Sequence, residues 1–170
     1  MTAARISLCA LMMLAASLCA PAQAVPATAD PTISLVSNAQ MASQGKDLIE
    51  KAKASATGIA SAELESYPGH TVVLVARAKT GPAEIHANWN DVVFVLDGEA
   101  TEVTGGTILG GTLNASTGET SGTGIEGGTR TRIAKGDLVH IPPNTPHWAV
   151  LAPGKTLLTC IVKVAATASK

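Results

Sequence analysis

Short apolar segments separated by glycine and proline dominate the chain from residue 71 onward. Residues 71–79 are rich in valine, and their side chains alternate between two faces, as in a strand. Further extended segments are expected at 84–86, 91–96, 99–104, 138–141, 148–151 and 156–164. Many short strands with turn residues between them are typical of a sandwich or barrel. The pattern therefore predicts an all-β domain.

The segment before these strands has a helical pattern. From Asn38 to about Ala56, good helix formers predominate and apolar side chains recur at roughly helical spacing. Gly58 is a plausible stop, and residues 61–65 could add a short turn. We therefore expect an N-terminal helical segment at 38–66, packed on the outside of a barrel at 67–170.

Two glycine-containing stretches interrupt the strands. Asp97-Gly98 is a hairpin-turn signal. Residues 105–128 hold nine glycines and five threonines, and they are either a long loop or a glycine-broken hairpin. The side chains that still pack in the hairpin would be Ile108, Leu109, Leu113 and Ile125. Either form could lie over the mouth of a barrel.

Residues 1–24 have the pattern of an export signal. Arg5 precedes an apolar stretch at 6–19, and Ala22-Gln23-Ala24 is a small-residue cleavage pattern. The alternative, a buried N-terminal helix, fits less well because the stretch is apolar on every side. We expect a signal peptide at 1–24, a flexible spacer at 25–37 and a periplasmic or secreted product. No later stretch is long and apolar enough to cross a bilayer, so no membrane partner is expected after cleavage.

Loss of the leader also changes the cysteine count and the charge. Cys9 and Cys19 lie in the leader, so Cys160 alone remains and no disulfide can form within one chain. Cys160 lies in an apolar run, where a packed, unreactive thiol is expected. The formal charge changes from −1 to −2 because Arg5 is lost. With neither a basic patch nor interleaved aromatic residues, nucleic acid is not an expected partner.

Two of the four histidines lie in distinctive contexts. His86 begins the stretch His-Ala-Asn-Trp-Asn-Asp, which ends at Asp91, seven residues before Gly98. His147 ends the second stretch, which begins with Gly136-Asp137 and contains Ile-Pro-Pro and Pro-His. These two stretches carry the candidate chemistry of the chain.

The two stretches resemble the paired motifs of the cupin superfamily, and the resemblance covers residues 67–164. It implies a double-stranded β-helix, or jelly roll, and a divalent metal bound by residues of both motifs. Three residues match the family ligands: His86, Asp91 and His147. Asn88 stands where a second histidine is usual and is the fourth candidate ligand, and Asn144 stands where glycine is usual. Imidazole binds Zn, Fe, Mn or Ni well, whereas a carboxamide oxygen is a weak ligand for the softer metals.

The resemblance leaves two functions for the pocket open, besides a structural or assembly role for the barrel. A metal-dependent enzyme would use the ion as a Lewis acid or to bind oxygen, in oxygenase, isomerase or lyase chemistry on a small organic substrate. Its candidate catalytic residues are His86, His147 and His140. Strand alternation can aim His140 inward as a proton carrier, or outward as an ordinary surface group. The other function is a metal-free pocket that binds a small molecule without catalysis. Similar cupins commonly form homodimers, which we also expect here.

Overall fold

The computed structural model describes residues 34–166, which form one helix and twelve strands. Helix α1 spans Asn38–Ala54. The strands are β1 (Ile59–Tyr67), β2 (His70–Arg77), β3 (Ala83–His86), β4 (Trp89–Thr104), β5 (Thr107–Leu109), β6 (Thr112–Asn114), β7 (Glu119–Gly122), β8 (Gly124–Glu126), β9 (Thr129–Ala134), β10 (Leu138–Ile141), β11 (His147–Val150) and β12 (Leu157–Ala165). The expected export signal lies outside the described residues. Among residues 34–166, no helix is long and apolar enough to span a membrane.

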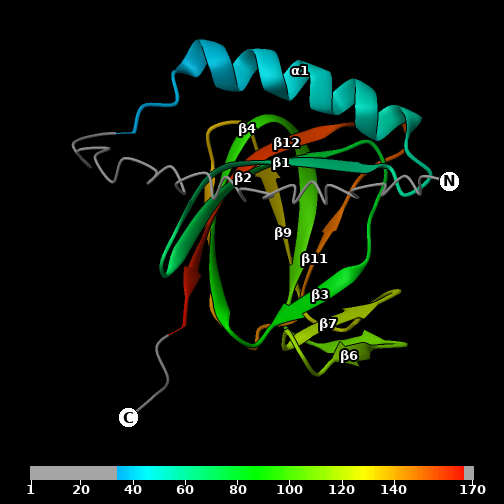
Figure 1. Cartoon of the computed structure of the whole chain (residues 1–170). Coiled ribbons are helices and arrows are strands. Elements are labelled where there is room, and N and C mark those ends of the chain that lie inside the picture. Colours follow the sequence, from blue (N-terminus) through cyan, green and yellow to red (C-terminus); the bar gives the residue numbers. More distant parts are fainter. Residues whose placement is uncertain (1–33, 167–170) are drawn as a thin grey trace, which may run out of the picture. The chain divides into compact units, whose positions relative to one another are not determined.

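Strand β4 joins the two layers of a curled antiparallel sheet (Figure 1). Its first half pairs with β12 and β10, and its second half pairs with β11 and β9. The strand changes layer near Leu96, where the register against β12 shifts by one residue. Gly98 follows with φ +83, and a Cβ there would collide with the carbonyl oxygen of Thr156. The hairpin turn predicted at Asp97-Gly98 is therefore wrong, since the glycine serves a bend within one continuous strand.

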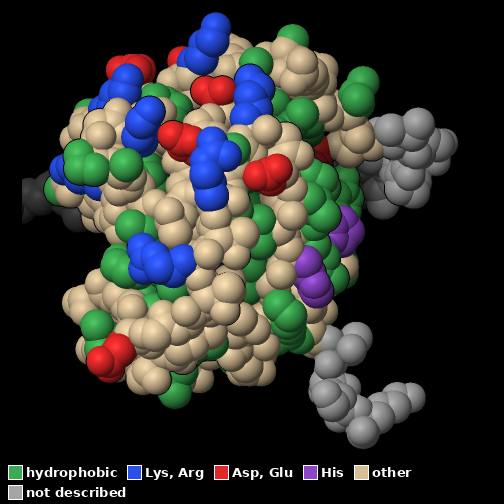
Figure 2. Space-filling model, turned by 180° about the vertical axis from the view of Figure 1, so that it is seen from behind, with side chains coloured by type: hydrophobic (Ala, Val, Ile, Leu, Met, Phe, Trp, Pro, Cys, Tyr) green, Lys and Arg blue, Asp and Glu red, His purple; other side chains and the backbone are tan. Residues whose placement is uncertain are grey.

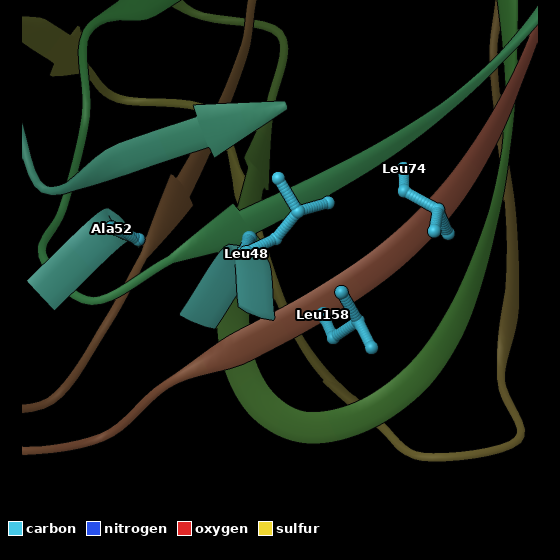
Figure 3. Close-up of a cluster of buried hydrophobic side chains, with 5 residues drawn as sticks. Leu48, Ala52, Leu74 and Leu158 are labelled. Carbon is cyan, nitrogen blue, oxygen red and sulfur yellow. The ribbon is translucent and has the colours of Figure 1, made fainter. Parts of the chain in front are cut away.

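Helix α1 packs on the outer face of the sheet, as the sequence predicts. Ser37 and Gln40 form a capping box at its start. Leu48 and Ala52 are buried against Leu74 and Leu158 of β2 and β12 (Figure 3). This apolar cluster anchors the helix to the strands.

The helix ends earlier than predicted. Its last residue is Ala54, and strand β1 (Ile59–Tyr67) takes up residues 59–66, which the sequence assigns to the helical segment. This strand pairs with β2 from Ile59 opposite Arg77 to Tyr67 opposite His70. Its small and polar side chains carry little strand signal of their own, so the pairing with the valine-rich β2 decides the conformation. The barrel therefore begins at Ile59.

The glycine-rich stretch is a broken hairpin, one of the two forms expected. Strand β5 pairs with β8, and β6 pairs with β7. Ile108 and Ile125 pack on a core cluster that contains Val103, whereas Leu109 and Leu113 are exposed. Strand β7 also pairs with β3, which sets the stretch beside the interior of the barrel.

Candidate functional site

A buried ion pair lies at one end of the barrel interior. Lys163 of β12 stands directly opposite Asp91 of β4, and its Nζ lies 2.8 and 2.9 Å from the two carboxylate oxygens. Burial alone would raise the pKa of Asp91, but hydrogen bonds to His86 and Lys163 outweigh it and lower the pKa. Asp91 is therefore an anion whose two oxygens are both bound.

His86, the last residue of β3, is held between two carboxylates. Its Nε2 lies 3.4 Å from Oδ2 of Asp91, and its Nδ1 contacts Oε2 of Glu119 on β7. Burial lowers the pKa of His86, but the hydrogen bonds to Asp91 and Glu119 raise it above its ordinary value. The contact with Glu119 ties the glycine-rich hairpin to the site.

His147, the first residue of β11, is buried and faces the same interior. Its Nδ1 donates to the carbonyl oxygen of Thr145 at 3.0 Å, which leaves the Nε2 lone pair free for another partner. Burial lowers its pKa, and the positive charge of His86 lowers it further. The two imidazole rings lie 4.9 Å apart. His147 is therefore a neutral imidazole, the form that binds metals.

The turn before His147 sets the spacing of the two histidines. Asn144 has φ +60, the left-handed conformation in which glycine is usual. Its backbone N–H donates to the carbonyl oxygen of His86 at 2.9 Å. Asn144 thus replaces the expected glycine without losing the turn, because asparagine tolerates this conformation better than most residues.

Glu84 completes a donor group that the motif comparison did not assign. It lies two residues before His86 on β3 and directly opposite His147. Donor atoms of Glu84, His86 and His147 lie within 4.8 Å of one another. Ligands of one tetrahedral zinc lie roughly 3.4 Å apart, so small side-chain rotations would bring these atoms into range. Because Glu84 alternates with His86 along the strand, the sequence already indicates that both side chains face inward. The spacing of the family motif, however, assigns Glu84 no role.

Two predicted site residues are not brought to this group. Asn88 is exposed, and its amide nitrogen donates to the carbonyl oxygen of Thr117 at 3.0 Å. His140 is exposed on β10, so its side chain points outward, one of the two orientations that the sequence allows. Since neither side chain faces the interior, neither is retained in the candidate site.

A small cavity of about 50 Å³ adjoins the donor group. Its wall is largely apolar, with polar side chains contributed by Arg77, Glu84, Asp91, Glu102, His147 and Thr159. Glu102 is buried and accepts a hydrogen bond from the backbone N–H of Trp148 at 3.1 Å. Burial raises the pKa of Glu102 to about 7. The cavity has room for a few water molecules or a small ligand.

The topology and the convergence of both motifs on one interior decide the fold. Two antiparallel layers share the bent strand β4, and His86, Asp91 and His147 all face the space between them. The fold is a jelly-roll barrel, the arrangement that the motif resemblance implies. The jelly-roll barrel with an outer helix is thus confirmed, although a fold by itself assigns no reaction.

Several solved structures, some of them cupins, are similar to this chain. A variant of PAC13 with uridine, from Streptomyces, is 14% identical, with a TM-score of 0.46 over 68% of this chain and 76% of that chain. KdgF from Halomonas sp. is 17% identical, with a TM-score of 0.45 over 64% and 82%. A Cupin 2 conserved barrel domain protein from Salinispora arenicola is 16% identical, with a TM-score of 0.45 over 65% and 78%. No family model and no curated protein matches the chain.

Proposed function

We propose that this cupin holds a divalent metal ion on His86, His147 and Glu84 and binds a small organic molecule in the adjoining cavity. The observation that carries the proposal is the donor group itself, with its atoms within 4.8 Å of one another. Outer partners occupy Nδ1 of both histidines, namely Glu119 and the carbonyl of Thr145. Such partners commonly orient metal-binding histidines and leave Nε2 for the ion.

Asp91, which the motif predicts as a ligand, is the next donor in this proposal. Its Oδ2 lies 3.4 Å from Nε2 of His86, a spacing that suits two ligands of one ion. Lys163, however, binds both of its oxygens. We therefore assign the carboxylate ligand to Glu84 and make Asp91 a fourth ligand only if Lys163 releases it.

Two imidazoles and a carboxylate suit zinc, iron, manganese or nickel. The bound ion would supply Lewis acidity, or oxygen binding in the case of iron, for an enzyme of the oxygenase, isomerase or lyase type. Within the protein, His147 would stay neutral and present Nε2 to the site, because its Nδ1 proton is held by Thr145. The apolar wall of the cavity would keep bulk water from a bound molecule.

A second function, a metal-free binding pocket, is favoured by one observation. Contacts with Asp91 and Glu119 raise the pKa of His86, and a protonated imidazole has no lone pair for a metal. In that case His86 and His147 would hydrogen-bond a small molecule directly, without catalysis.

Elemental analysis of protein purified without a His-tag separates the two functions. The metal site predicts close to one divalent ion per chain after reconstitution, and loss of that ion in His147→Ala. His140→Ala is the matched control, since it removes an exposed histidine and should keep the ion. If the wild-type protein remains metal-free after reconstitution but is stabilised by a small molecule, the second function is correct.

We further propose that the protein is exported and forms a homodimer. Export is supported by the leader pattern at residues 1–24. N-terminal sequencing of the protein recovered from the periplasm or medium should start near Val25. Dimerisation is supported by Phe94, Leu138 and Val164, large hydrophobic residues that are exposed on β4, β10 and β12. Figure 2 shows hydrophobic side chains gathered beside exposed histidines. Light scattering should give twice the chain mass, and Leu138→Asp should halve it.

A further inference from the structure

Arg77 is a largely buried cation that has no hydrogen-bond partner among the described residues. It is the last residue of β2, its side chain is 15% exposed, and it lines the same cavity as His147. Its nearest anion is Glu84, at 3.8 Å between Nη2 and Oε2, which is beyond hydrogen-bonding distance. Arginine keeps its charge at all ordinary pH values, so the interior holds a positive charge with an unused set of donors.

The guanidinium of Arg77 lies against Gly81. A Cβ on Gly81 would lie 2.5 Å from Nη1 of Arg77, although Gly81 does not need glycine for its backbone angles. The glycine therefore leaves space for the arginine. The carbonyl oxygen of Gly81 also accepts a hydrogen bond from Nε1 of Trp148 at 2.8 Å, which fixes this turn against the wall of the cavity.

The donors of Arg77 are open to a ligand. Among the described residues, every fully buried side-chain nitrogen or oxygen has a hydrogen-bond partner. Because Arg77 donates no hydrogen bond to any of them, its nitrogens must reach the cavity or solvent. A guanidinium presents paired N–H groups that match the two oxygens of a carboxylate.

The neighbouring acids do not fill this role. In the proposed function Glu84 turns toward the metal, which leaves Arg77 without its nearest anion. Two other acids line the cavity: Asp91 is bound by Lys163, and burial disfavours the charged form of Glu102 more than the nearby charge of Arg77 favours it. A ligand carboxylate would restore the charge balance that a buried cation requires.

We propose that Arg77 binds the carboxylate of a small organic acid whose opposite end faces His147. The cavity of about 50 Å³ suits a ligand of a few heavy atoms. The assignment names the substrate class of the proposed function and rests on it for the role of the metal. The contact between Arg77 and the carboxylate itself needs no ion.

Binding of matched acids and amides tests the proposal. The probes are formate, acetate, glycolate and pyruvate, each compared with its neutral amide at constant ionic strength by calorimetry. We expect at least one acid to bind wild-type protein roughly 10- to 100-fold more tightly than its amide, the range for hydrogen bonds to a charged group. Arg77→Gln should abolish this preference. Arg77→Lys should weaken it, because lysine lacks the paired N–H groups of a guanidinium. Arg132→Gln, which removes an exposed arginine paired with Glu99, should keep it.

The titrations are run on metal-free and zinc-loaded protein, with zinc binding measured separately. Failure to bind zinc would overturn the metal site and leave the acid preference to be judged on the metal-free protein. If every acid binds no better than its amide in both forms, the role of Arg77 is wrong. A preference for acids over amides that persists in folded Arg77→Gln protein would also show that the role of Arg77 is wrong.

Discussion

The two faces of the sheet formed by β2, β4 and β12 bury different kinds of side chain. The outer face packs Leu74 and Leu158 under helix α1, and every member of that cluster is apolar. The inner face buries Asp91 of β4, with Lys163 bound to it and His86 of β3 beside it. Apolar burial stabilises a fold without further requirements, whereas each buried charge needs a partner. The difference teaches that the outer face supports the barrel and the inner face serves a site.

The largest expected effect concerns the outer face alone. Leu74 of β2 is fully buried in the apolar cluster under helix α1. Leu74→Ala should lower the free energy of unfolding by about 3 kcal/mol, from lost burial and the cavity left behind. Urea unfolding would measure this loss. Metal content should stay unchanged, and a loss of metal would show that the two faces are not independent.

Glu102 should make the inner face sensitive to pH. Its folded pKa of about 7 lies above its ordinary value of 4.5. The folded protein therefore binds the extra proton, and stability should fall as pH rises from 4.5 to 7. The full difference is about 3 kcal/mol. Unfolding of Glu102→Gln at pH 5 and pH 8 should lack this decline, and an equal decline in the variant would assign it to another group.

Lys163 tests whether the buried pair is needed for stability. Lys163→Met leaves Asp91 buried without its main partner and should cost about 2 kcal/mol, less than for a fully enclosed pair because Lys163 is partly exposed. The double variant Lys163→Met with Asp91→Asn should recover most of this loss. A double-mutant cycle without recovery would mean that the pair does not act as a unit.

Glu84 and Asp91 compete for the role of carboxylate ligand. Glu84→Gln should weaken zinc binding by roughly 10- to 100-fold, about 1.4 to 2.8 kcal/mol. Asp91→Asn should weaken it less, because Lys163 already binds both oxygens of Asp91. Competition with a chelator gives both affinities. If Asp91→Asn weakens zinc binding more than Glu84→Gln does, Asp91 is the carboxylate ligand, as the motif predicts.

The smallest expected effect comes from the glycine-rich hairpin. Glu119→Gln keeps the shape of the side chain but weakens its contact with His86, so zinc affinity should fall about tenfold. Stability should change little because Glu119 is partly exposed. Glu126→Gln, on the same hairpin, is the control and should leave zinc affinity unchanged. Equal affinities in wild type and Glu119→Gln would mean that this hairpin does not orient the histidine.

Much of the barrel could be predicted from local pattern. Alternating aliphatic residues gave β2, β10 and β12 within about two residues, since each has a strong strand preference. Strand β1 was missed because its stability comes from pairing with β2 rather than from its own side chains. Gly98 was predicted to lie in a hairpin turn because a positive φ occurs both in turns and in strand bends. Only the pairing with β12 shows that it lies in a bend within one strand.

The sequence by itself determined the two cupin-like motifs, the inward placement of His86, Asp91 and His147, and the helix outside the barrel. Only the tertiary structure decided which other side chains contact these three residues. Glu84 meets His147 through the pairing of β3 with β11, Glu119 reaches His86 from β7, and Lys163 reaches Asp91 from β12. Asn88 and His140 are exposed instead. The physical reason is that sequence spacing sets the direction of a side chain along its own strand. Its partner depends on register, and register arises only when the strands pair.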